Sequence, residues 1–187
     1  MANKDAAFGL KPIGKIGQNR DNQGLSEYDI AASASAIYFQ DPVEMAATGT
    51  ITVAAATDTL LGSLTGVFFT DANTSKPTFA NHLDASNAAT DIKGFVADDP
   101  YERFEVQSDG ATAAADVGLN ADIVYAAGSS PDYVSGVELD FSDQKTATAQ
   151  LRILGISKDP DNNTAGSANV NLVVTINEHF LKGTVGI

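Results

Sequence analysis

The chain contains 187 residues and no cysteine, which excludes disulfide bonds and thiolate metal sites. Its 24 acidic and 11 basic residues give a net charge of -13, and a chain this acidic repels the phosphate backbone of nucleic acids. We therefore expect no nucleic-acid partner. Apolar runs fall short of the ~20 residues that a membrane helix needs, so we expect a soluble chain without a membrane segment or signal peptide.

Residues 1–24 predict an extended arm. They contain four glycines, one proline and only scattered apolar residues, too few to bury a core of their own. In residues 1–20, four basic residues against one acidic residue give +3, whereas seven against 23 give -16 for the rest of the chain. Such an arm can anchor in a partner's grooves through apolar side chains, with basic side chains facing acidic neighbours. The predicted contact residues are Lys4, Phe8, Leu10, Lys11, Ile13, Lys15, Ile16 and Arg20; a frayed terminus is the alternative.

Residues 25–187 predict a β-rich domain. Thr, Val, Gly, Asn and Asp are plentiful, whereas strong helix formers are scarce. Apolar and polar residues alternate with strand periodicity in 169–180 and in 103–107. The segment 150–157 is apolar on both faces after its start, which is typical of a central strand. Further predicted strands are 34–40, 49–55, 64–70, 92–97, 121–126 and 135–141.

Clusters of Asp, Asn, Gly, Ser and Pro separate these segments, as expected for turns between short strands. About nine short strands with regular turns favour an all-β fold, a β-sandwich or a barrel of jelly-roll type, with the arm extending from it. Residues 84–90 hold one helical turn at most.

Two segments partly match known ligand-binding motifs. Residues 9–15 match the start of a phosphate-binding P-loop, but Ile16 stands where a hydroxyl should bind magnesium, and Pro12 removes an amide donor. Asp159, Asp161 and Asn163 are spaced like the first half of a calcium loop, but the glycine and the final glutamate that such a loop requires are absent. We therefore expect no nucleotide at residues 9–15, which belong to the predicted arm, and we interpret residues 159–163 as a polar loop between strands.

The two histidines, His82 and His179, have no second imidazole at ligand spacing, and no G-x-S-x-G motif supplies an activated serine. His179 is interpreted as a surface or interface residue. The absence of tryptophan also leaves few stacking platforms for a sugar in a glycosidase site. The sequence therefore predicts no catalytic, cofactor-binding or metal-binding residues, and a protein that is not an enzyme.

Seven stretches resemble, in order along the chain, a family of small virion proteins of tailed bacteriophages that are described as capsid decoration or cement proteins. They are MANKDAAFGLKPIG (1–14), AIYFQDPV (36–43), KPTF (76–79), VADDP (96–100), AQLRILGI (149–156), DPDN (159–162) and VTINEH (174–179).

This resemblance implies a virion protein that binds the outer surface of the capsid and stabilises the shell by linking neighbouring major capsid subunits. It implies no enzymatic activity, synthesis in the host cytoplasm, and a homo-oligomer, with a trimer favoured. The alternative is a host-attachment or glycan-binding module displayed on the virion, as a head fibre or tail component. The major capsid protein itself is a weaker alternative, because the chain is short and lacks a long helical segment.

Overall fold

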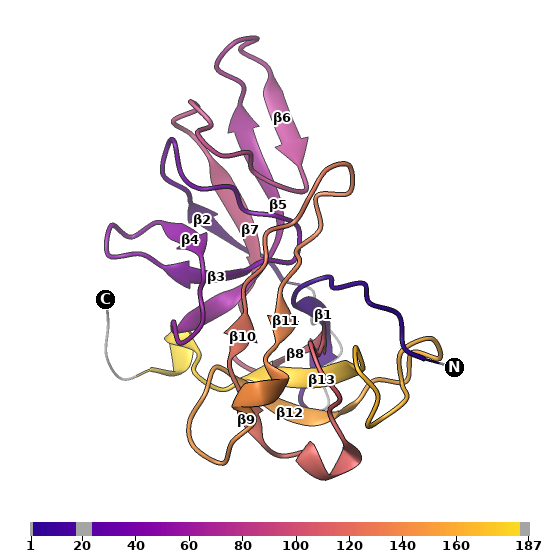
Figure 1. Ribbon diagram of the computed structural model, residues 1–187. Helices are drawn as coiled ribbons and strands as arrows, with labels where there is room; N and C mark the ends of the chain where they lie inside the picture. The colour runs from indigo at the N-terminus through magenta and orange to yellow at the C-terminus, as the bar shows by residue number, and fades with distance from the viewer. Residues whose placement is uncertain (1, 18–23, 184–187) are drawn as a thin grey trace.

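The computed structural model describes residues 2–17 and 24–183. Within these residues the protein is all-β, with thirteen strands and three single turns of 3-10 helix, and every strand pair is antiparallel. The strands form two main sheets and a small two-stranded ribbon (Figure 1). The predicted all-β sandwich is thus confirmed. No helix among the described residues is long and apolar enough to cross a membrane.

The first main sheet has five strands, and the N-terminal strand lies at one of its edges. Its order is β1 (Lys11–Lys15), β8 (Glu102–Gln107), β13 (Asn171–Ile176), β12 (Leu151–Ile156) and β9 (Asn120–Ala121). One face of this sheet is fully buried, because alternate residues of its strands are apolar and point to the same side. These are Phe104, Val106, Leu151, Ile153, Leu172 and Val174.

The second main sheet has six strands, and one of its hairpins projects from the molecule. The order is β2 (Ser26–Asp29), β7 (Lys93–Ala97), β5 (Leu60–Thr70), β3 (Pro42–Met45) and β4 (Ile51–Val53), and β6 (Pro77–Ala80) pairs with the far end of β5. Figure 1 shows the β5–β6 hairpin at the end of the molecule opposite β12 and β13.

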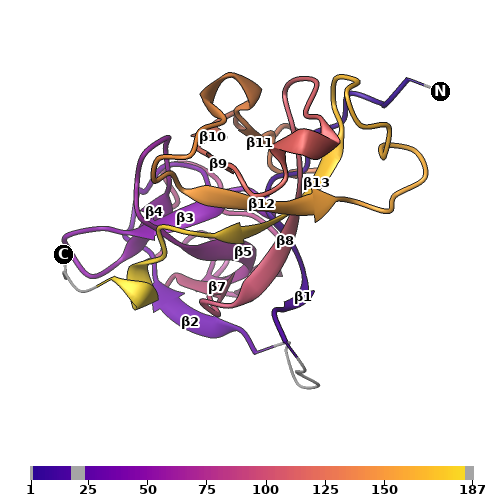
Figure 2. The same ribbon diagram turned by 90° about the horizontal axis from the view of Figure 1, so that it is seen from below.

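Short elements complete the fold. The ribbon consists of β10 (Ile123–Val124) and β11 (Glu138–Leu139), and the helical turns are η1 (Ala114–Asp116), η2 (Phe141–Asp143) and η3 (Phe180–Lys182). Each main sheet covers its own apolar cluster, and Leu60 and Ala97 of the six-stranded sheet belong to the cluster of the five-stranded sheet. Figure 2 shows β12 and β13 lying across the strands of the other sheet.

The prediction of a separate arm is wrong for residues 2–17, because part of this segment forms β1 of the five-stranded sheet and the residues before β1 bond to the body. β1 pairs with β8, and Leu10 is completely buried in the core. The Leu10 N–H donates to the carbonyl of Gln40 at 2.9 Å, and the Ser63 hydroxyl donates to the Leu10 carbonyl at 2.6 Å. The predicted boundary at residue 24 therefore does not separate these residues from the β-rich body.

The opposite charges of the N-terminal segment and the body are paired within the same chain. Lys4 binds Asp161 at 2.6 Å, and Lys15 binds Asp99 at 2.5 Å. Burial of Leu10 contributes about 2 kcal/mol, whereas ion pairs at the surface contribute little, because water and salt screen them. The apolar anchor, more than the charges, therefore holds the segment in place.

Candidate binding surface

The described residues contain no group of three or more His, Asp or Glu side chains that could hold a metal ion. In the calcium-like segment, the acidic side chains have other partners. Asp161 binds Lys4, and one oxygen of Asp159 accepts a hydrogen bond from the Asn171 side chain at 3.2 Å. The P-loop-like segment forms β1 and so presents no phosphate-binding loop. Both segments thus have structural partners in place of a ligand.

The interpretation of His179 as a surface or interface residue is wrong, because its side chain is only 2% exposed. Its Nδ1 accepts the N–H of Leu181 at 3.1 Å, and its Nε2 has no partner among the described residues. Burial, with the charge of Lys182 adding to it, lowers the pKa of His179 to about 4. The imidazole is therefore neutral at pH 7 and caps η3.

The other histidine, His82, lies in a stack of aromatic rings. Its ring is 3.8 Å from that of Tyr133, nearly parallel to it, and Tyr38 lies 6.5 Å away on a similar plane. Its Nδ1 contacts the Asn81 side chain at 2.8 Å. The His82 ring thus makes its contacts within the protein, and in the described part of the chain none of its hydrogen bonds is to a serine.

The outer face of the five-stranded sheet differs in charge from the rest of the protein. In the strand register, Thr175 pairs with Arg152 on one side and with Arg103 on the other, so both arginines point outward in one row. The next row contains Val173 and Glu105. We call this surface the cationic face; its residues are Lys11, Ile13, Arg103, Glu105, Arg152, Leu154, Ile156, Lys158, Asp159, Val173 and Thr175.

The cationic face carries four basic and two acidic residues, a net charge of +2 on a chain of -13. Glu105 is already engaged, because it accepts the Ser157 hydroxyl and binds Lys11 at 3.3 Å. Arg103, Arg152 and Lys158 lie within 4 Å of no carboxylate in the described part of the chain.

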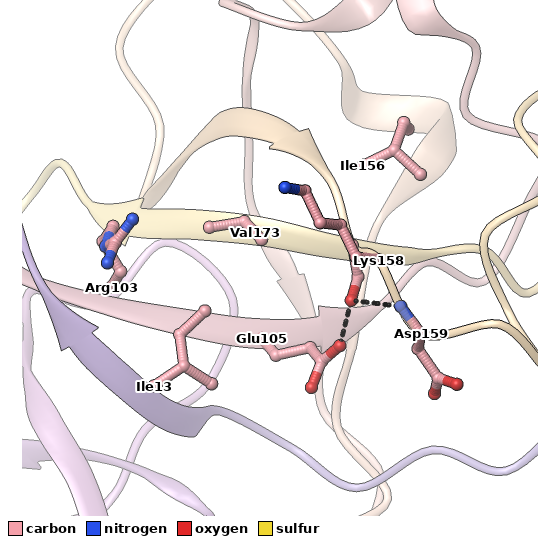
Figure 3. Close-up of a pocket in the computed structure, with 8 residues that line it drawn as sticks. Ile13, Arg103, Glu105, Ile156, Lys158, Asp159 and Val173 are labelled. Carbon is pink, nitrogen blue, oxygen red and sulfur yellow. Dashed lines mark hydrogen bonds between the residues drawn. The ribbon is translucent and has the colours of Figure 1, made fainter.

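A shallow hollow of about 500 Å³ lies in the cationic face. Ile13, Ile156 and Val173 supply its apolar lining, and Arg103 and Lys158 extend over it from different strands and loops (Figure 3). Ile13 in the hollow is 40% exposed, and Leu154 of β12 is 38% exposed. The Nε atom of Arg103 is buried and has no hydrogen-bond partner among the described residues. The surface thus combines cations that have no carboxylate partner among the described residues with exposed apolar side chains.

The structure brings two of the eight predicted contact residues, Lys11 and Ile13, onto this face. The other predicted residues are dispersed. Leu10 is in the core, Phe8 is half-buried, Lys4 and Lys15 pair with acidic residues, and Ile16 is 48% exposed outside the hollow. Arg20 lies outside the described residues.

Sequence reasoning missed Arg103, Arg152 and Lys158 as members of a site. The alternation in 103–107 and the start of 150–157 do place the two arginines opposite the apolar residues. Their convergence depends on β13 lying between β8 and β12, which no local pattern reveals.

Comparison with known proteins returned no family model, no curated protein and no solved structure that matches this chain.

Proposed function

We propose that the protein is a non-enzymatic virion component that binds the outer surface of a tailed-phage capsid and links neighbouring major capsid subunits. The seven stretches of sequence that resemble capsid decoration proteins support this proposal. The observation that carries it is the cationic face. This face presents unpaired cations around an exposed apolar hollow on a strongly acidic chain. Exposed apolar surface ringed by polar residues is characteristic of a protein interaction site.

The chemistry of the face favours a protein partner over a nucleic acid. Four basic residues with two acidic residues among them give a weak cationic field, and the rest of the chain repels phosphate. An acidic capsid surface with one protruding apolar side chain would match the face, with that side chain in the hollow and carboxylates against the arginines. Arg103 and Arg152 would bind such carboxylates in a planar, two-pronged geometry.

We expect side chains of the cationic face to make most of the contact with the capsid. Pairing of a capsid strand with the edge strand β1 is disfavoured. β1 is an edge strand, but it is only five residues long, contains Pro12 and carries lysine at both ends. Its register with β8 is also interrupted between Pro12 and Gly14. Proline, lysine and bulges on an edge strand all discourage pairing with a further strand.

Association of several copies would strengthen the attachment. If a trimer forms, the second and third contacts are made at an effective concentration near millimolar, so that weak single contacts become lasting attachment. This assembly is part of the proposal.

Charge reversal on the cationic face tests the proposal. Arg152→Glu combined with Lys158→Glu should weaken binding at least tenfold, about 1.4 kcal/mol, to empty capsids assembled from the major capsid protein of the same phage. The matched control for Lys158→Glu by itself is Ala47→Glu combined with Ala56→Glu, because both changes alter the net charge by -2 and both alanines are exposed in turns on either side of β4. This control should bind within about twofold of the wild type, whereas Lys158→Glu should bind more weakly. Co-sedimentation at increasing protein concentration measures the affinity.

Two results would overturn the proposal. One is unchanged capsid binding by a folded double variant. The other is wild-type protein that binds host cells or glycans but has no affinity for capsids, which would favour the attachment module.

A further inference from the structure

Three phenylalanine rings lie on the outer face of the six-stranded sheet. Phe79 of β6 is 4.8 Å from Phe68 of β5 and 6.4 Å from Phe95 of β7, between ring centroids. Phe79 is 74% exposed, and the other two side chains are half-buried. We call these three residues the aromatic patch.

The patch belongs to neither core cluster of the protein. Alternate residues of the same strands, Leu64, Val67 and Val96, point to the opposite face and are completely or almost completely buried there. The aromatic rings therefore project from the solvent side of a sheet whose inner side is already packed. Two of the three rings belong to the projecting β5–β6 hairpin (Figure 1). Exposed apolar surface marks interaction sites, and aromatic residues, phenylalanine included, are enriched at protein interfaces.

The rim of the patch is acidic. Glu27 and Asp29 of β2 have exposed side chains, and the register places Glu27 beside Phe95. The nearby cation, Lys93, is held by both carboxylates at 3.3 and 2.7 Å. One basic against two acidic residues leaves a net charge of -1, so the patch is complementary to an apolar surface with a basic rim.

We propose that the aromatic patch docks a protein surface that has an apolar centre and a lysine- or arginine-rich rim. Given the proposed function, on which this inference rests, that surface belongs to a second capsid subunit. Patch-to-patch contact between two copies would bring Glu27 and Asp29 of both copies together. Contact between the patch and the cationic face of another copy is also disfavoured, because it would cover the surface that we propose binds the capsid.

The positions of the two surfaces suit a bridge. The cationic face lies on the sheet that contains β12 and β13. Phe68 and Phe79 of the aromatic patch belong to the β5–β6 hairpin at the opposite end of the molecule, and Phe95 belongs to the neighbouring strand β7 (Figure 1). A protein with two such surfaces can contact two neighbouring subunits at once. The second contact is then intramolecular and strengthens attachment without any change in the first.

The test removes the most exposed ring. Phe79→Ser should leave the fold intact, and Tyr101→Ser is the matched control, because Tyr101 is an exposed aromatic residue (60%) outside the patch. On empty capsids assembled from the major capsid protein of the same phage, Phe79→Ser should bind at least tenfold more weakly than the wild type. It should also no longer raise the temperature at which the shell disassembles. Tyr101→Ser should match the wild type in both measurements.

A second variant tests the acidic rim. Glu27→Lys combined with Asp29→Lys should also weaken capsid binding at least tenfold, and the wild-type affinity should fall as salt is added. Unchanged affinity and shell stabilisation in Phe79→Ser, with wild-type protein binding normally, would overturn this inference alone. Failure of the wild type to bind capsids would overturn the proposed function and this inference with it. Sedimentation velocity compares the oligomeric states of the wild type and Phe79→Ser. An oligomeric wild type with a monomeric Phe79→Ser would show that a second copy occupies the patch, and this result would also overturn the inference.

Discussion

Asp41 is a fully buried carboxyl group at a junction of three segments. The N-terminal segment bonds to Gln40 beside it, and residues 133–135 bond to Phe39. One oxygen of Asp41 accepts the N–H of Tyr38 at 2.7 Å, and the other has no partner among the described residues. Burial raises the pKa of Asp41 from its ordinary 3.8 to about 6.

The raised pKa of Asp41 predicts a pH-dependent component of stability. The folded state holds this proton more tightly than the unfolded state, so the contribution is full below pH 3.8 and is lost as the pH rises to about 6. We expect the unfolding free energy of the wild type, relative to Asp41→Asn, to fall by roughly 3 kcal/mol over this range. Urea unfolding of both proteins at several pH values measures the difference, and parallel pH profiles would contradict it. Asparagine keeps an oxygen that can accept the Tyr38 N–H.

At the scale of elements, the close approach of β5 and β7 depends on a residue without a side chain. A Cβ atom on Gly62 of β5 would lie 2.2 Å from the backbone oxygen of Ala97, far inside van der Waals contact. The two backbones would have to separate to admit it. Because β5 also pairs with β3 and β6, such a shift would disturb the centre of the six-stranded sheet.

We therefore expect Gly62→Ala to lower the unfolding free energy by about 2 kcal/mol or more. Gly155→Ala is the matched control, because Gly155 also lies in a strand but a Cβ there meets no atom within 4 Å. Its effect on the unfolding free energy should stay within about 1 kcal/mol, because no atom is displaced and alanine restricts the unfolded chain. Denaturant titration of both variants decides the matter; equal destabilisation would show that the contact with Ala97 is unimportant.

At the scale of the whole molecule, the charge of -13 opposes the compact state through repulsion among carboxylates. Salt screens this repulsion, with a screening length of about 10 Å at 0.1 M. We expect the midpoint of thermal unfolding to rise by a few degrees between low salt and about 0.5 M sodium chloride. The rise should shrink near pH 4.5, where many carboxylates are protonated. A midpoint that falls with salt at pH 7 would mean that attractive ion pairs outweigh the repulsion.

The sequence by itself determined the class of fold and its most regular strands. The predicted segment 103–107 covers all of β8 except its first residue, and segments 150–157 and 169–180 contain β12 and β13. Alternation of apolar and polar side chains reveals these strands because it is a local property of a half-buried strand. Predicted segments 49–55, 64–70 and 92–97 likewise contain β4 or overlap with β5 and β7. Segment 34–40 makes only isolated bridges, and β2, β3 and β6 were missed, since these short strands are defined by their neighbours.

The tertiary structure alone decided the place of the N-terminal segment and the composition of the cationic face. Leu10 finds its partners at Gln40 and Ser63, and β1 pairs with β8 about ninety residues away. Arg103 and Arg152 share a row only because β13 lies between their strands in a particular register. The direction of a side chain follows from local alternation, whereas strand order and register follow from which distant surfaces bury one another best.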